Sequence, residues 1–217
     1  MRTFLISILL IFSAIRCCGQ EMKFKYHEIG RFGKLMGQTA LVDVNNNGYL
    51  DWVFGVRGEM YFYQYVSPSE WILREIGKGA KTDVGGCPLD VNKDGWIDFI
   101  VGDSWYENTG DPQNKTFVLH TKNMLGTAHD VIAVDIDGDG IKDIVQMSNH
   151  ADHPVLAWYR IPENYHANWD YLKISPGIHG GIAPRGYGDL DNDGDIDIVT
   201  KPWSGDLHFF LENKVFE

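Results

Sequence analysis

The chain has 217 residues, which is room for one domain, and 30 acidic residues against 19 lysines and arginines give it a net charge of −11. No stripe of basic residues runs through the sequence, so no nucleic-acid partner is expected. Of its three cysteines only Cys87 lies outside the N-terminal region, so no intrachain disulfide is predicted for the mature domain.

Residues 1–19 have the features of a secretory signal peptide. Arg2 supplies a short positive region, and residues 4–15 are apolar apart from two serines, a run too short to span a membrane. Cleavage near residues 17–19 predicts a mature domain of residues 20–217 that is secreted, periplasmic or at the cell surface. A lipid anchor on Cys17 or Cys18 is the alternative, although Arg16 fits a lipidation signal poorly.

Strand patterns begin in the mature chain at residues 24–29, where apolar residues alternate. One pattern then occurs four times: a run of small or branched residues, an acidic loop, a β-rich second run and an aromatic third run. The runs before the loops are residues 39–42, 86–89, 131–134 and 186–188. The second runs are residues 52–54, 98–101, 144–145 and 198–199, and the third are 60–63, 105–108, 156–159 and 208–211. Outer fourth strands are predicted at 71–76, 117–120 and 169–174, and the last repeat lacks one.

The acidic loops begin at Asp43, Asp90, Asp135 and Asp189, at intervals of 47, 45 and 54 residues. Oxygen-bearing side chains recur at loop positions 1, 3, 5 and 9, and a glycine at position 6 allows a tight turn that brings them together. Such a cluster repels itself, so Ca²⁺ is the expected cofactor, with the backbone carbonyl at position 7 as a further ligand. The predicted ligands are Asp43, Asn45, Asn47, Tyr49 and Asp51; Asp90, Asn92, Asp94, Trp96 and Asp98; Asp135, Asp137, Asp139, Ile141 and Asp143; and Asp189, Asp191, Asp193, Asp195 and Asp197.

An EF-hand is excluded, because its loop needs a glutamate at position 12 and a helix on each side. Position 12 is Phe54, Val101, Gln146 or Thr200 here, and each loop leads into a β-rich run. The loops therefore lie between strands, and their regular spacing predicts stacked supersecondary units.

At residues 90–102 the sequence closely resembles the FG-GAP consensus, and the repeats over residues 22–217 resemble the FG-GAP and VCBS families. This resemblance implies an all-β propeller of about four blades with structural calcium. It is weak for function, because such blades serve adhesion, sugar binding and enzyme scaffolds alike. We predict that residues 24–29 complete the last blade and close the ring. The alternative is a partial ring that associates with another chain.

Calcium sites three and four, with four carboxylates each, are expected to bind best, and site one, with two, to be weakest. A second set of residues is expected at one mouth of the channel, where it can bind an acidic sugar or supply the groups for β-elimination of a uronic acid. Ordinary loop residues are the alternative interpretation. This candidate ligand set is His129, His179, Arg185, Tyr187, Lys201 and Trp203.

The sequence thus predicts a secreted calcium-binding repeat protein that binds an extracellular polysaccharide without catalysis. A polysaccharide lyase or dehydratase is the first alternative, and an adhesion module with a protein partner is the second.

Overall fold

The computed structural model describes residues 23–32, 37, 39–82, 86–122, 127–148, 155–176, 186–200 and 209–214. Within these residues the chain is all β, with strands in four antiparallel sheets. No helix in the described part of the chain is long and apolar enough to cross a membrane.

Each sheet contains consecutive strands in sequence order. The first is β1 (Thr39–Val42), β2 (Asp51–Val56), β3 (Glu59–Ser67) and β4 (Glu70–Lys78). The second is β5 (Cys87–Leu89), β6 (Asp98–Val101), β7 (Ser104–Glu107) and β8 (Val118–Thr121). The third is β9 (Ala128–Val134), β10 (Asp143–Ser148), β11 (Val155–Tyr159) and β12 (Tyr171–Pro176). The fourth is β13 (Tyr187–Gly188), β14 (Asp197–Thr200) and β15 (Phe209–Leu211). The strands predicted for the four repeats are therefore confirmed.

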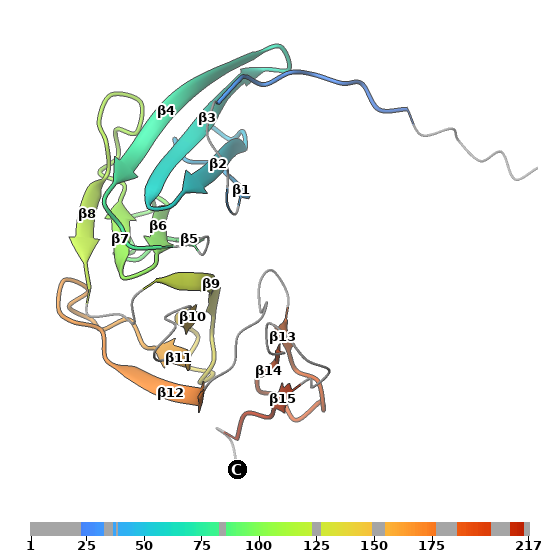
Figure 1. Cartoon of the computed structure of the whole chain (residues 1–217), viewed down its shortest axis with the longest axis vertical. Coiled ribbons are helices and arrows are strands. Elements are labelled where there is room, and N and C mark those ends of the chain that lie inside the picture. The colour runs from blue at the N-terminus through green and yellow to red at the C-terminus, as the bar shows by residue number, and fades with distance from the viewer. Residues whose placement is uncertain are drawn as a thin grey trace, which may run out of the picture.

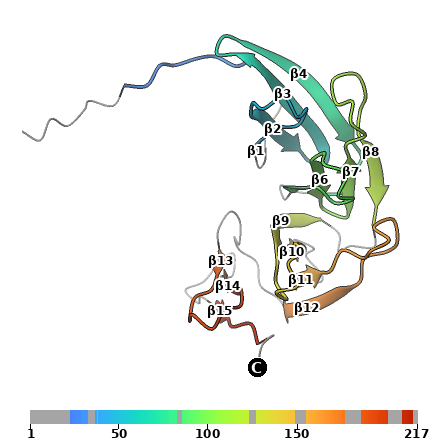
Figure 2. The ribbon, with the colours of Figure 1, turned by 180° about the vertical axis from the view of Figure 1, so that it is seen from behind.

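The sheets follow one another round an open arc (Figures 1 and 2). Strands β1, β5, β9 and β13 lie toward the middle of the arc, and β4, β8 and β12 lie on its outside. All the acidic loops join the innermost strand of a sheet to the next strand, so the topology repeats the same loop at each step of the arc.

Hydrophobic cores fill the spaces between adjacent sheets. Alternation along β6 shows why, because Phe99 packs toward the first sheet while its neighbour Ile100 packs toward the third. The third core, between the third and fourth sheets, is built around Met147, Leu156 and Ile198. Strands buried on both faces are expected to be rich in apolar residues, as β6 is after Asp98.

The N-terminal segment differs from the prediction. Residues 24–29 form no strand, and Phe24 and Tyr26 are 92% and 88% exposed. The chain instead places Phe32 on the outward face of the first sheet, with ring centroids 5.1 Å from Phe54 and 4.8 Å from Tyr61. The prediction that this segment completes the fourth sheet is therefore wrong. The physical reason is that apolar alternation does not specify a partner, and the first sheet offers an aromatic face nearer in the chain.

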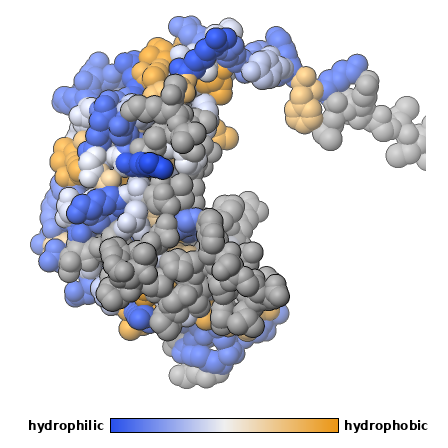
Figure 3. Space-filling model, viewed as in Figure 1, coloured by the Kyte–Doolittle hydropathy of each residue, from blue (hydrophilic) through white to orange (hydrophobic). Residues whose placement is uncertain are grey.

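Figure 3 shows that one side of the molecule is mostly hydrophilic, with separate hydrophobic patches, one of them over the first sheet. The aromatic outward face of that sheet is only partly covered by the N-terminal segment, since Leu41 and Leu73 remain 64% and 42% exposed.

Candidate metal centre

The acidic loops share an unusual backbone. Positions 4 and 6 of every loop have positive φ, which turns the chain back twice within three residues. Glycine occupies position 6 each time, at φ values of 86°, 88°, 85° and 102°, in the left-handed region that side chains rarely adopt. The residues concerned are Asn46, Gly48, Lys93, Gly95, Gly138, Gly140, Asn192 and Gly194.

This turn wraps the loop around the aspartate at position 1. In the second loop, Asp90 accepts hydrogen bonds from the N–H groups of Asp94 at 3.1 Å and Gly95 at 2.9 Å. Asp43 accepts the equivalent pair in the first loop, and Asp135 accepts from its loop glycine at 2.9 Å. These hydrogen bonds of the loop backbone therefore bring the side chains at positions 1, 3 and 5 close together by themselves.

Carboxylates converge in the third and fourth loops. Asp135, Asp137 and Asp139 each offer an oxygen within 4.8 Å of the others. Two oxygens bound to one calcium at about 2.4 Å each are separated by at most about 4.8 Å, so the cluster has the right size. The Oδ1 atom of Asp135 is buried and accepts no hydrogen bond from the described residues. A buried acceptor without a donor is what a bound cation would satisfy, and these hard oxygen donors fit Ca²⁺.

The fourth loop has a comparable cluster of Asp189, Asp191 and Asp197, with oxygens again within 4.8 Å of one another. Its Asp193 carboxylate accepts a hydrogen bond from the Asp195 N–H at 3.2 Å. This hydrogen bond helps to lower the pKa of Asp193, so the ionised form that a cation needs is favoured.

The aspartate at position 9 has a second, structural role. Asp98 is fully buried, and its two oxygens accept from the N–H groups of Val91 at 2.9 Å and Asn108 at 2.8 Å. Asp51 and Asp197 make the same pair of bonds in their own sheets. Position 9 therefore fastens the loop to the end of the third strand, and each of its oxygens keeps a further lone pair for an ion.

Burial raises the pKa of Asp98 to about 7, although its two backbone hydrogen bonds act in the opposite direction. Burial likewise raises the pKa of Asp143 to about 6. Without a cation these carboxylates are costly to ionise, and a neighbouring divalent ion would favour the ionised form.

Two asparagines connect neighbouring loops, a feature that the sequence interpretation missed. The Asn108 amide donates to the Val44 carbonyl of the first loop at 3.0 Å, and the Asn213 amide donates to the Ile136 carbonyl of the third loop at 2.7 Å. They hold equivalent places in the sheet register but stand 10 and 16 residues beyond their position-9 aspartates, so aligning the repeats on those aspartates does not reveal them.

Charged side chains beside the loops also differ between repeats. The Arg160 guanidinium forms an ion pair with Asp137 and lies 4.0 Å from Asp139. Glu107 occupies the corresponding place in the second repeat and accepts from Asn92 at 3.2 Å. The third loop therefore has a built-in cation beside its carboxylates, and the second has an additional carboxylate.

The candidate ligand set is placed only in part. His129 lies on β9, with its Nδ1 atom 3.4 Å from Asp130. Tyr187 lies on β13 and packs against the core between the third and fourth sheets. The other members, His179, Arg185, Lys201 and Trp203, lie outside the described residues, so their convergence stays a prediction.

A further polar cluster was not predicted. His120 lies 2.6 Å from Glu107 and stacks on Trp105, and its ring centroid is 4.9 Å from that of His166. His120 lies on β8 and His166 in the connection between β11 and β12, so no local sequence signal could have brought them together.

The comparisons with known proteins agree with the loop geometry. A family model described as FG-GAP-like repeat matches residues 90–146, from the first aspartate of the second loop through the third loop into β10. No curated protein matches the chain. The chain therefore carries an FG-GAP-like repeat at residues 90–146.

Proposed function

We propose that this chain is an extracellular calcium-loaded propeller module that binds a polysaccharide without cleaving it. The propeller assignment is supported by the order of the four sheets round an arc, each with its innermost strand followed by an acidic loop. It is also supported by the FG-GAP-like repeat at residues 90–146.

Calcium binding is the part that the geometry supports best, and the convergence of carboxylates in the third and fourth loops carries it. Three oxygens within 4.8 Å of one another suit a cation that takes six to eight oxygen ligands. Asp135, Asp137 and Asp139 would hold the ion in the third loop, and Asp189, Asp191 and Asp197 in the fourth. Its role would be to neutralise repulsion and make the turns rigid.

A calcium titration of the chelator-treated mature chain by isothermal calorimetry tests this part. Calcium should bind at two or more sites, and magnesium at the same concentration should bind far more weakly, because it demands smaller octahedral geometry. The proposal fails if calcium releases no heat and leaves the melting temperature unchanged.

Polysaccharide binding is supported by an aromatic platform, which we define as Tyr49, Tyr65 and Trp71. Tyr49 is at position 7 of the first loop and is 59% exposed, and its ring centroid lies 5.2 Å from that of Tyr65. Tyr65 in turn packs edge to face with Trp71 at 5.0 Å. Rings held in place by their neighbours present flat apolar surface at little entropic cost, which suits the C–H faces of sugar rings.

Depletion of the calcium-loaded protein by insoluble polysaccharides tests this role. Tyr49→Ala should weaken binding, because it removes the most exposed ring of the platform. Tyr26→Ala is the matched control, since Tyr26 is 88% exposed on the N-terminal segment away from these rings. Equal binding by Tyr49→Ala and the wild type, or release of unsaturated uronic products, would contradict the proposal.

A further inference from the structure

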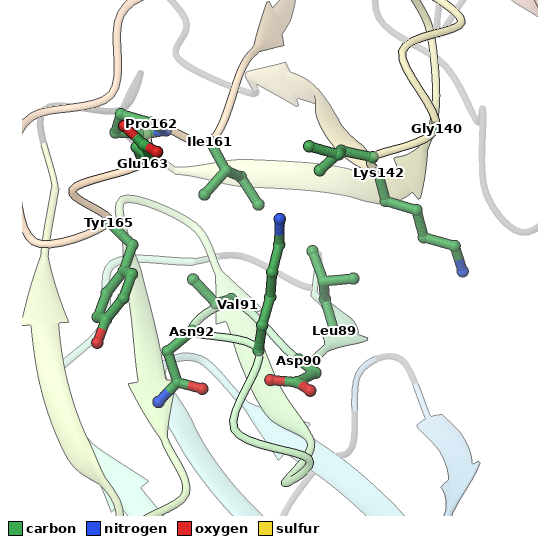
Figure 4. Close-up of a pocket in the computed structure, with 12 residues that line it drawn as sticks. Leu89, Asp90, Val91, Asn92, Gly140, Lys142, Ile161, Pro162, Glu163 and Tyr165 are labelled. Carbon is green, nitrogen blue, oxygen red and sulfur yellow. The ribbon is translucent and has the colours of Figure 1, made fainter.

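A cavity of about 410 Å³ lies between the second and third sheets, on the side of the acidic loops. We name it the junction cavity. Its walls come from the end of β5 with the second loop, from the third loop, and from the connection that follows β11 (Figure 4). Smaller hollows of about 280 and 270 Å³ occur at the other two junctions. The first has one residue from each of two acidic loops in its lining, Ile136 and Ile196, and the second has none. The lining residues are Leu89, Asp90, Val91, Asn92, Lys93, Gly140, Ile141, Lys142, Ile161, Pro162, Glu163 and Tyr165.

Among the described residues, this junction also lacks an asparagine bridge that the other two junctions have. In the second and fourth sheets, the residue after the position-9 aspartate pairs with Tyr106 and Leu211, respectively. Asn108 and Asn213 each lie two residues beyond that partner. In the third sheet the residue at that pairing position is Tyr159, so the equivalent place is taken by Ile161. An isoleucine has no amide to donate across the junction, so the bridge made twice elsewhere is missing between the second and third loops.

The lining has an apolar wall and a polar rim. Figure 4 shows Ile161, Val91 and Leu89 gathered on one part of the wall, with Asp90 and Asn92 beside them and Tyr165 on the other side. Glu163 also lines the cavity and is exposed. Apolar contact surface with a few polar groups is typical of small-ligand sites, and an aromatic ring with aliphatic carbons suits the C–H faces of a sugar.

The charges favour a neutral ligand that is rich in hydroxyl groups. Glu163 supplies a carboxylate that can accept hydrogen bonds from hydroxyls, whereas both oxygens of Asp90 already accept N–H groups of its own loop. Lys142 lines the cavity, but its ammonium group points away from it in Figure 4. The lining carries two carboxylates, of Asp90 and Glu163, and two ammonium groups, of Lys93 and Lys142. It therefore has no net charge, which favours a ligand rich in hydroxyl groups over a carboxylate-bearing sugar.

We infer that the junction cavity binds one or two rings of a neutral oligosaccharide, as a site distinct from the aromatic platform. This inference rests on the proposed polysaccharide-binding function and names a second place where the glycan is held. Two acidic loops form its walls, so removal of calcium should weaken the site as the loops loosen.

The decisive variant is Ile161→Asn, which gives the third sheet the amide that the other two junctions carry. It should replace an apolar part of the wall by an amide that can donate to the Val91 carbonyl, and so reduce the affinity for a neutral trisaccharide by about tenfold or more. Ile174→Asn is the matched control, because Ile174 is also half-buried but lies on β12 beside a different hollow. Glu163→Gln is a second, exposed change that should weaken binding without affecting folding, with Glu70→Gln as its control.

Isothermal calorimetry on the calcium-loaded mature chain would use cellotriose, xylotriose and mannotriose, with trigalacturonate as the acidic comparison. Binding of a neutral trisaccharide that is lost in Ile161→Asn and kept in Ile174→Asn supports the inference. Tighter binding of trigalacturonate, or affinity unchanged by both Ile161→Asn and Glu163→Gln, overturns it.

Failure of this site is separable from failure of the proposed function. If the protein binds insoluble polysaccharide through Tyr49 but no neutral trisaccharide, only the junction-cavity inference is wrong. If it binds neither polysaccharide nor trisaccharide, the proposed function is wrong as well.

Discussion

Replacing Asn108 by alanine should remove the bridge between the first and second acidic loops. Asn108 is fully buried, and its amide donates to the Val44 carbonyl at 3.0 Å and to the Ile97 carbonyl at 3.4 Å. Its side-chain oxygen accepts from the Gly110 N–H at 3.2 Å. At about 1 kcal/mol for each net hydrogen bond, with a small added cost for the space left behind, the loss in unfolding free energy is about 3 kcal/mol.

A loss of this size should lower the melting temperature by roughly 6–12 °C for a domain of this length. Scanning calorimetry in saturating calcium measures it directly. Asn114→Ala is the matched control, because Asn114 is exposed and its amide donates to Asp111 alone among the described residues, so its cost should stay within about 0.5 kcal/mol. A change for Asn108→Ala no larger than that of the control would refute the idea that this amide joins the loops.

Four other outcomes are expected. Chelation should lower the melting temperature by several degrees, and in saturating calcium Asp193→Ala should cost more stability than Asn47→Ala, since its loop has more carboxylates. Phe32→Ala should lower the unfolding free energy by about 1–3 kcal/mol, measured by urea titration, because it uncovers the first sheet. In chelator, stability should fall as the pH rises from about 4 to about 8, because burial raises the pKa of Asp98 to about 7 and the folded state holds its proton more tightly; a stability that rises over this window would be contradictory. Arg160→Gln should tighten terbium binding in the third loop, because it removes a competing cation; sensitised terbium luminescence measures this affinity.

The repeated sheets could be predicted because each repeat carries its own local signal. The glycine at loop position 6 and the aspartates around it mark where an inner strand ends, as at Asp90 and Gly95. The apolar run after each loop then begins the next strand, and aromatic residues such as Trp105 mark the third. The strands could be predicted because each one is specified by residues close to it in the sequence.

The parts that sequence could not supply depend on partners distant in the chain. The N-terminal segment was assigned to the wrong sheet because nothing in its alternation distinguishes the fourth sheet from the face that Phe32 covers. The bridge from Asn213 to Ile136 spans 77 residues, and the meeting of His120 with His166 depends on two sheets packing together. Tyr187 stays a predicted ligand-binding residue, and its packing against the core between the third and fourth sheets depends on contacts that sequence does not give.

If the loops bind calcium as proposed, ligand count alone would not set the order of their affinities. Ligand count predicts equal affinity for the third and fourth loops. In the third loop, however, the Arg160 guanidinium is paired with Asp137. An incoming ion would have to displace that charge or share its carboxylate. The second loop has three carboxylates, and Glu107 beside it adds negative charge that attracts an ion while holding Asn92 in place. If the loops bind calcium as proposed, these neighbours bring the second and third loops closer in affinity and leave the fourth as the strongest site. Position-9 aspartates such as Asp98 also hydrogen-bond each loop to the end of its third strand. Calcium binding at a loop would therefore also stabilise the sheet to which that loop belongs.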